Sequence, residues 1–119
     1  MKDFRTLTVW QKAHALTLAV YVATRAFPRE ELYGLTSQLR RGSASISSNI
    51  AEGCGRGTEL DFARCLQMAM GSASEVEYQL LLARDLAFLD EAAHLRLSSA
   101  CTEVKRMLTG LIQKLTADR

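Results

Sequence analysis

The chain has 119 residues, of which 48% are hydrophobic and 24% are charged, and its formal net charge is +2. This length and composition are typical of one globular domain, residues 1–119, that is long enough to bury its own core. The mild positive charge argues against a protein that coats nucleic acid, although it allows a local basic patch. The chain has no apolar run of the ~20 residues that a membrane helix needs, and its first residues have no apolar signal core.

Three cysteines, Cys54, Cys65 and Cys101, form no CxxC pair, and their odd number does not suit a disulfide framework. We therefore expect free thiols and a reducing, cytoplasmic location. Cys65 and Cys101 fall on or beside apolar stripes, where cysteine behaves as a small core residue. No histidine lies near any of the three in the sequence, so we predict no catalytic residue and expect a protein that is not an enzyme.

The first amphipathic segment extends from about Thr8 to Phe27. Its apolar residues alternate in steps of four and three, which keeps them on one face of a helix: Val9, Ala13, Leu16, Val20, Ala23 and Phe27. Pro28 ends the segment, because the residue before a proline is pushed out of helical geometry.

The second segment, from about Arg29 to Gly53, has similar spacing but is rich in glycine and serine. These are poor helix formers, glycine costing up to ~1 kcal/mol relative to alanine, so tertiary packing must hold this helix. We expect it to bend or fray near Ser47. Gly53, Gly55 and Gly57 then predict a firm stop and a turn.

The third segment begins at Thr58, which forms a capping-box pattern with Asp61, and ends near Leu89. The fourth begins after Asp90, a good N-cap residue. Strand signals are absent. Four segments of this kind, joined by short connections, predict an all-α protein, an antiparallel up-down four-helix bundle.

The third segment carries more apolar residues than one bundle stripe needs. A broad core stripe could explain this surplus, but we favour a second buried face at a subunit interface, since large apolar patches are rare on monomers. The small residues from Gly71 to Ser74 would allow close helix contact there. The additional residues are Cys65, Met68, Met70, Tyr78, Leu81, Leu82, Leu86 and Phe88.

The adjacent arginines Arg40 and Arg41 are the first candidates for a functional site. Adjacent positions on a helix point roughly 100° apart, so only one of the two can lie deep against a neighbouring helix. One interpretation is phosphate contact, in which Lys12, Arg56 and Arg64 would join them. The other, which we favour on residue chemistry, is ion pairing across the bundle, because arginine suits carboxylates as well as phosphate. The candidate partners are Glu52, Glu75 and Glu77.

Two further patterns are weaker. The glycine-rich turn after Asn49 leads into a helix N-terminus, which is a physical anion site. However, no Gly-Lys-Ser/Thr follows it and no strand precedes it, so we favour a plain turn. Glu91-x-x-His94 is half of a di-iron motif, but the second half is missing. We therefore predict no metal site and no cofactor.

Three stretches carry a family resemblance: VWQKAHALTLAVY, FPREELYGLTSQLRRGSASISSNIAEGCGR and DFARCLQMAMGSASEVEYQLLLARDLAFL. With them the chain resembles the bacterial four-helix-bundle proteins encoded within intervening sequences of large-subunit ribosomal RNA, over roughly residues 3–112. One departure is Ser47, where the family often carries proline. The most specific parts are Trp10-Gln11-Lys12-Ala13, Tyr33-Gly34-Leu35, Gln38-Leu39-Arg40-Arg41, Asn49-Ile50-Ala51-Glu52-Gly53, Gly55-Arg56, and Gly71-Ser72 followed by Glu75.

The resemblance implies an antiparallel four-helix bundle that assembles as a ring-like homopentamer. It also implies kinship with the accessory proteins of diversity-generating retroelements, similar bundles that work with a reverse transcriptase and RNA. We therefore expect a non-enzymatic cytoplasmic homo-oligomer of poorly defined role, binding RNA or a nucleoprotein partner through Lys12, Arg40, Arg41, Arg56 and Arg64. The alternative is a protein-interaction scaffold without nucleic-acid affinity, whose arginines are structural. Neither interpretation needs a membrane or a small-molecule substrate.

Overall fold

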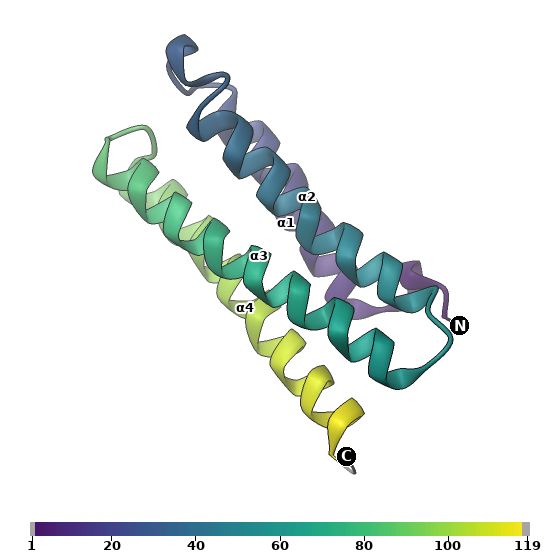
Figure 1. Cartoon of the computed structure of the whole chain (residues 1–119). Coiled ribbons are helices and arrows are strands. Elements are labelled where there is room, and N and C mark those ends of the chain that lie inside the picture. Colours follow the sequence, from purple (N-terminus) through teal and green to yellow (C-terminus); the bar gives the residue numbers. More distant parts are fainter. Residues whose placement is uncertain (1, 118–119) are drawn as a thin grey trace.

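The computed structural model describes residues 2–117, so Met1, Asp118 and Arg119 of the predicted domain lie outside the described residues. Four long helices form an antiparallel bundle (Figure 1): α1 (Thr8–Thr24), α2 (Leu35–Cys54), α3 (Glu59–Asp85) and α4 (Glu91–Thr116). Two short 3-10 helices precede α1 and α2, η1 (Phe4–Thr6) and η2 (Arg29–Glu31). No strand occurs between residues 2 and 117. The predicted all-α up-down bundle is confirmed.

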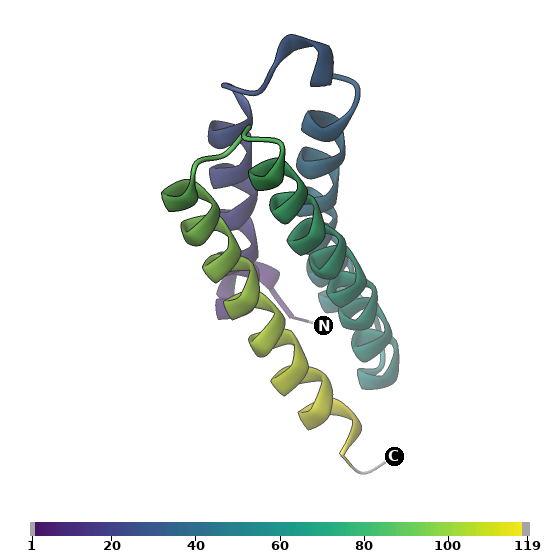
Figure 2. The same ribbon diagram turned by 90° about the vertical axis from the view of Figure 1, so that its left-hand side faces the viewer.

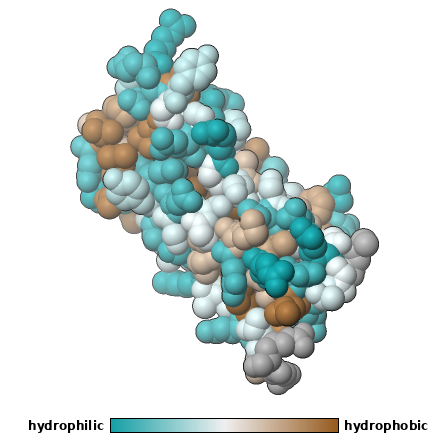
Figure 3. All heavy atoms as spheres, in the orientation of Figure 1, coloured by the Kyte–Doolittle hydropathy of each residue, from teal (hydrophilic) through white to brown (hydrophobic). Residues whose placement is uncertain are grey.

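The bundle is an elongated body of 46 × 21 × 20 Å in which each long helix contacts its two neighbours, in the cyclic order α1, α2, α3, α4. The α1–α2 and α3–α4 connections lie at one end, and the α2–α3 turn lies at the other (Figures 1 and 2). The last turns of α4 extend past the start of α1 (Figure 2). The face turned to the viewer in Figure 3 is largely polar, with apolar side chains gathered near the α3–α4 connection.

One hydrophobic core runs the length of the bundle, and the predicted apolar stripes supply it. The side chains of Leu16, Ile46, Leu66 and Leu108 are at most 1% exposed. On α3 the stripe is buried from Phe62 to Ala83. On α4 it is buried from Leu97 to Leu108, and the last leucines of the helix are partly covered. Burial of this apolar surface is the main force that holds the four helices together.

Three helix ends differ from the predictions. α1 ends at Thr24 rather than Phe27, and α2 begins at Leu35 rather than Arg29. The intervening chain turns through η2, and the Glu31 carboxylate accepts the Leu35 amide at 3.1 Å, which caps α2. Phe27 is nevertheless buried, and its ring lies 5.5 Å from that of Phe88 in the neighbouring connection.

α3 ends at Asp85, four residues before the predicted Leu89, and its end is held by main-chain hydrogen bonds. The Ala83 carbonyl accepts the amides of Phe88 and Leu89 at 2.8 and 3.3 Å. Ala87 takes a left-handed conformation with φ of 64° to make this turn. A helix commonly ends with a residue in this conformation, although the residue is usually glycine.

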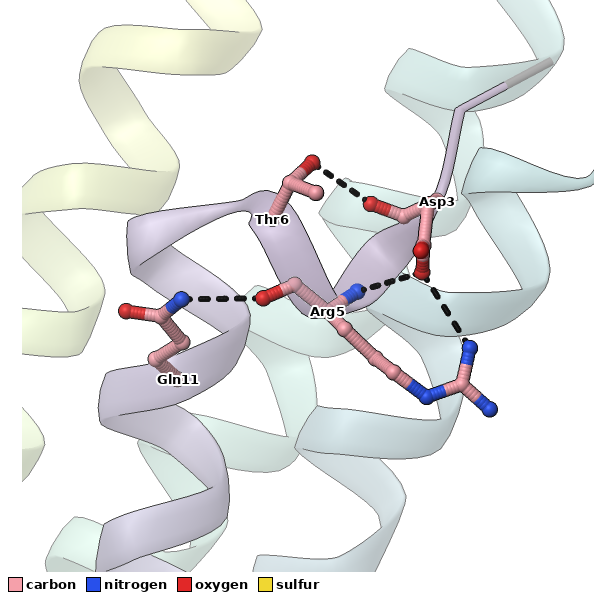
Figure 4. Close-up of polar contacts among 4 residues, drawn as sticks. All are labelled: Asp3, Arg5, Thr6 and Gln11. Carbon is pink, nitrogen blue, oxygen red and sulfur yellow. Dashed lines mark hydrogen bonds and ion pairs between the residues drawn. The ribbon is translucent and has the colours of Figure 1, made fainter.

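The N-terminal segment is fixed by polar contacts around η1 (Figure 4). The Asp3 carboxylate accepts the Arg5 amide at 3.0 Å, and the Gln11 side chain on α1 donates to the Arg5 carbonyl at 2.9 Å. The Lys2 amide donates to the Cys54 carbonyl at 2.9 Å. The start of the chain is therefore joined to both α1 and the end of α2.

α2 is one unbroken helix, and it does not fray at Ser47. Ser43 is fully buried, and the Thr17 hydroxyl on α1 donates to its carbonyl at 3.0 Å. The other side of α2 lies close to α3. A Cβ atom at Gly42 would approach Val76 Cγ2 to 3.0 Å, and one at Gly53 would approach Phe62 Cδ1 to 2.7 Å. Tertiary packing thus holds this helix, as its composition requires.

We predict that Gly53→Ala lowers the free energy of unfolding by about 1–3 kcal/mol, because a methyl group there overlaps the Phe62 ring. Gly110→Ala is the matched control, since a Cβ atom at that position has no neighbour within 4 Å. It should raise stability by up to ~1 kcal/mol through helix propensity alone. Urea denaturation of both variants checks this. Equal stability of the two would contradict the close α2–α3 contact.

Candidate functional site

Arg40 is the deep member of the arginine pair. Its Nε donates to the Thr24 hydroxyl at 2.9 Å and its Nη2 to the Tyr21 carbonyl at 3.4 Å. Its guanidinium also lies 4.8 Å from the centre of the Tyr21 ring. These contacts join α2 to the last turns of α1. The predicted carboxylate partners are wrong for Arg40, since Thr24 and Tyr21 satisfy it instead.

Arg41 points to the other side of α2 and is exposed. Its side chain makes no hydrogen bond or ion pair with any residue in the part of the chain that the structure describes. The ion pairs predicted for it are therefore absent there as well. Of the five basic candidates, Arg41 has its whole donor set available to a ligand.

The remaining three candidates form surface ion pairs. Lys12 Nζ lies 3.1 Å from Glu103, Arg56 Nη2 lies 3.6 Å from Glu52, and Arg64 Nη1 lies 3.2 Å from Asp61. Glu52 raises the pKa of Arg56 through its negative charge. All these side chains are about half exposed or more, apart from the 43% exposed Asp61. Such pairs contribute little to stability, and solvent or a ligand can replace either partner.

The five basic residues do not form one patch on a single chain. Lys12 lies on α1 beside α4, whereas Arg56 and Arg64 lie near the α2–α3 turn. Arg41 is in the first half of α2, roughly 20 Å along the helix axis from that turn. Arg40 faces α1. A continuous basic surface would need either several copies of the chain or a long ligand.

Arg41 borders a polar groove between α2 and α3, with a volume of about 350 Å³. We call this the α2–α3 groove. Two of the stretches that carry the family resemblance meet in it, the one ending at Arg41 and the one from Gly71 to Glu75. The residues that line it are Gln38, Arg41, Gly42, Ser45, Ser72, Glu75 and Gln79.

Part of the groove is an internal hydrogen-bond network. The hydroxyls of Ser45 and Ser72 lie 2.9 Å apart, and the Asn49 side-chain amide donates to the Ser45 carbonyl at 2.9 Å. Asn49 is therefore a structural residue. The other groups are unsatisfied: Glu75 has no partner among the described residues, and the buried Gln79 Oε1 accepts no hydrogen bond.

The sequence pattern singles out Arg41 as a site residue but not Gln38, Ser45 or Gln79. A signal was available, because polar residues recur at helical spacing on both elements. On α2 they stand at positions 38, 41, 45 and 49, and on α3 at positions 72, 75 and 79. What the sequence does not show is that these two polar stripes face each other.

The glycine-rich turn between α2 and α3 has the features of a plain turn. The Thr58 hydroxyl accepts the Asp61 amide at 3.1 Å, which caps α3. Glu59 and Asp61 in the first turn already place negative charge at the positive end of the helix. An added anion would meet these carboxylates as well as Arg56, so the geometry does not favour an anion site.

Two of the three thiols lie in environments that disfavour the thiolate. Cys54, Cys65 and Cys101 are all free and buried. Burial raises the pKa of Cys101 to about 11, and its Sγ donates to the Ala73 carbonyl at 3.3 Å. Burial also raises the pKa of Cys54. Nucleophilic chemistry needs the thiolate, which these environments disfavour. Within residues 2–117 no cluster of three or more potential metal ligands occurs.

A second groove, of about 550 Å³, lies between α1 and α4, and we call it the α1–α4 groove. Alanines and leucines line most of it, with Lys12, Glu103 and Arg96 among its polar residues. Val22, which lines it, is 58% exposed, and Leu18 on the same helix is 55% exposed. The outer face of the second half of α1 is thus apolar, although the opposite face already forms the core, whereas Gln11, Lys12 and His14 in the first half are polar and exposed. None of the described helices has both the length and the hydropathy to cross a bilayer.

Comparison with known proteins agrees with these features. Residues 5–110 match the model of the 23S rRNA-intervening sequence protein family. The chain belongs to this family. Its fold is similar to the crystal structure of a protein of unknown function from the S23 ribosomal protein family of Bacteroides thetaiotaomicron. The two chains are 22% identical, with a TM-score of 0.81 over 89% of this chain and 99% of the other. No curated protein matches the sequence.

We predict that Arg40→Ala lowers the free energy of unfolding by about 1–2 kcal/mol, because it removes the hydrogen bond to Thr24 and the contact with Tyr21. Arg41→Ala is the matched control and should change stability by less than about 0.5 kcal/mol, as exposed sites commonly do. Thermal and urea denaturation monitored by circular dichroism checks both. A larger loss for Arg41→Ala would show that the structural role belongs to the other arginine.

Proposed function

We propose that this member of the 23S rRNA-intervening sequence family is a non-enzymatic cytoplasmic scaffold that works as a homo-oligomer, a pentamer. The observation that carries this proposal is the apolar outer face of α1. An apolar helix surface is normally buried, yet Leu18 and Val22 in the second half of α1 are more than half exposed on the single chain. The α1–α4 groove beside them extends the same surface. The pentameric number comes from the family resemblance.

Residue chemistry supports a scaffold over an enzyme. Burial raises the pKa of the Cys54 and Cys101 thiols, which favours their neutral form. The basic candidates Lys12, Arg40, Arg56 and Arg64 are engaged within the chain. Four of the five residues proposed to bind nucleic acid thus have structural partners. The contacts of Arg40, which join α2 to α1, favour the interpretation in which the arginines are structural.

If the α1 face is the subunit interface, the double substitution Leu18→Glu/Val22→Glu should reduce the oligomer to a folded monomer. Two buried unpaired carboxylates per interface would each cost several kcal/mol in association. Analytical ultracentrifugation gives the mass, and circular dichroism shows that the helices remain. Gln67→Glu, an exposed position on α3, should leave the mass unchanged. An oligomer that survives the double substitution would rule out this face as the interface.

RNA or a nucleoprotein remains a second candidate partner, and the free guanidinium of Arg41 is the observation that favours it. The kinship with the accessory proteins of diversity-generating retroelements that the resemblance implies would favour the same partner. In an oligomer, one Arg41 per subunit would be repeated at regular intervals. Such a repeat provides the extended basic surface that a single chain lacks.

For this candidate we predict that a structured RNA binds with an affinity that falls as salt increases, and that Arg41→Ala reduces the slope of log K against log salt by about 1 per contacting subunit. Fluorescence anisotropy at several salt concentrations measures it. Arg64→Ala, whose side chain is already paired with Asp61, should have a smaller effect. The absence of binding at low salt would leave the scaffold as the function.

A further inference from the structure

The α2–α3 groove contains two opposite charges that do not neutralise each other. Arg41 and Glu75 both line it, on facing helices, yet neither pairs with the other or with any other described residue. Close by on the same helix, Glu77 forms an ion pair with Lys105 on α4 at 2.9 Å. Pairs of this kind therefore form in this bundle where the side chains meet. In the groove, a space separates the two charges.

The floor of that space has an unsatisfied acceptor. Gln79 Oε1 is buried and accepts no hydrogen bond, and within residues 2–117 no other buried side-chain nitrogen or oxygen lacks a partner. An unpaired buried acceptor destabilises the folded chain, because it has lost its hydrogen bonds to water and gained none. Gly42 keeps the space open beside it, since a Cβ atom there would lie 3.5 Å from this oxygen.

Arg41, Glu75 and Gln79 Oε1 together suit a ligand that carries both a negative and a positive group. Arg41 offers a planar donor pair that suits a carboxylate, which it can bind through two parallel hydrogen bonds. Glu75 and Gln79 Oε1 offer only acceptors, which suit an ammonium group with its three donors. A simple anion would leave Glu75 and Gln79 unsatisfied, and a simple amine would leave Arg41 without a partner.

We propose that the α2–α3 groove binds a small zwitterion of the α-amino acid class. Its carboxylate pairs with Arg41 and its ammonium donates to Glu75. The ammonium also donates to Gln79 Oε1 once that side chain turns its buried oxygen toward the groove. The polar lining at Gln38 and Ser72 accommodates a short polar side chain rather than an apolar one. This site does not depend on the proposed scaffold or RNA functions, because it needs only residues of one chain.

The experiment is isothermal titration of the full-length protein with L-glutamine and with two analogues that each lack one charge. N-acetyl-L-glutamine lacks the ammonium, and L-glutamine amide lacks the carboxylate. We expect saturable binding of L-glutamine, weakened at least about tenfold by either modification. Arg41→Gln and Glu75→Gln should each weaken it by a similar factor, and Arg64→Gln, outside the groove, should not change it.

Three results would overturn the proposal. They are no heat from L-glutamine at millimolar concentration, equal binding of the N-acetyl analogue, and binding that survives both groove substitutions. Circular dichroism of each variant ensures that lost binding is not lost folding. RNA binding that requires Arg41, combined with no response to L-glutamine, would assign the arginine to phosphate and also overturn the zwitterion site. The oligomer mass measured in parallel separates this outcome from failure of the scaffold proposal.

Discussion

The close approach of α2 to α3 is the constraint on which the rest of the structure depends. α2 has the composition of a poor helix, and its glycines and serines would not hold that conformation alone. They hold it because small residues let α3 come close, at Gly42 against Val76 and at Gly53 against Phe62. The same closeness brings Ser45 within hydrogen-bond distance of Ser72. One packing contact therefore stabilises the helix and also builds the α2–α3 groove.

The fold could be read from the sequence because the apolar periodicity is strong in all four helices. Leu16, Leu66 and Leu108 fall on the predicted stripes and are almost completely buried. The ends of the helices were less predictable, since they depend on contacts between distant segments. Phe27 was predicted to be helical, but it is buried outside α1 against Phe88 of the other connection. Ala87 adopts a positive φ that its residue type does not predict.

In the candidate site, too, some features follow from the local sequence and others depend on contacts between helices. Helical geometry allows only one of two adjacent arginines to lie deep, and this follows from the sequence. Which one does so depends on where α1 ends, because Arg40 needs the hydroxyl of Thr24 and the ring of Tyr21. Whether Arg41 and Glu75 line the same groove likewise depends on how α2 is rotated about its axis relative to α3. Spacing within one helix could not give either result.

The cyclic order of the helices keeps the two grooves apart. In the order α1, α2, α3, α4, the α1–α4 pair and the α2–α3 pair lie on opposite sides of the bundle. A second copy that covers Leu18 and Val22 therefore does not itself cover Arg41 and Glu75. In a ring each chain also buries a second, different face, and the α2–α3 groove stays accessible if that face lies elsewhere on the bundle. The apolar face suits permanent burial, since exposing it again would be costly. The polar groove suits exchange with solvent, because water can hydrate its charges whenever a ligand leaves. The two sides of one small bundle can thus serve assembly and recognition separately.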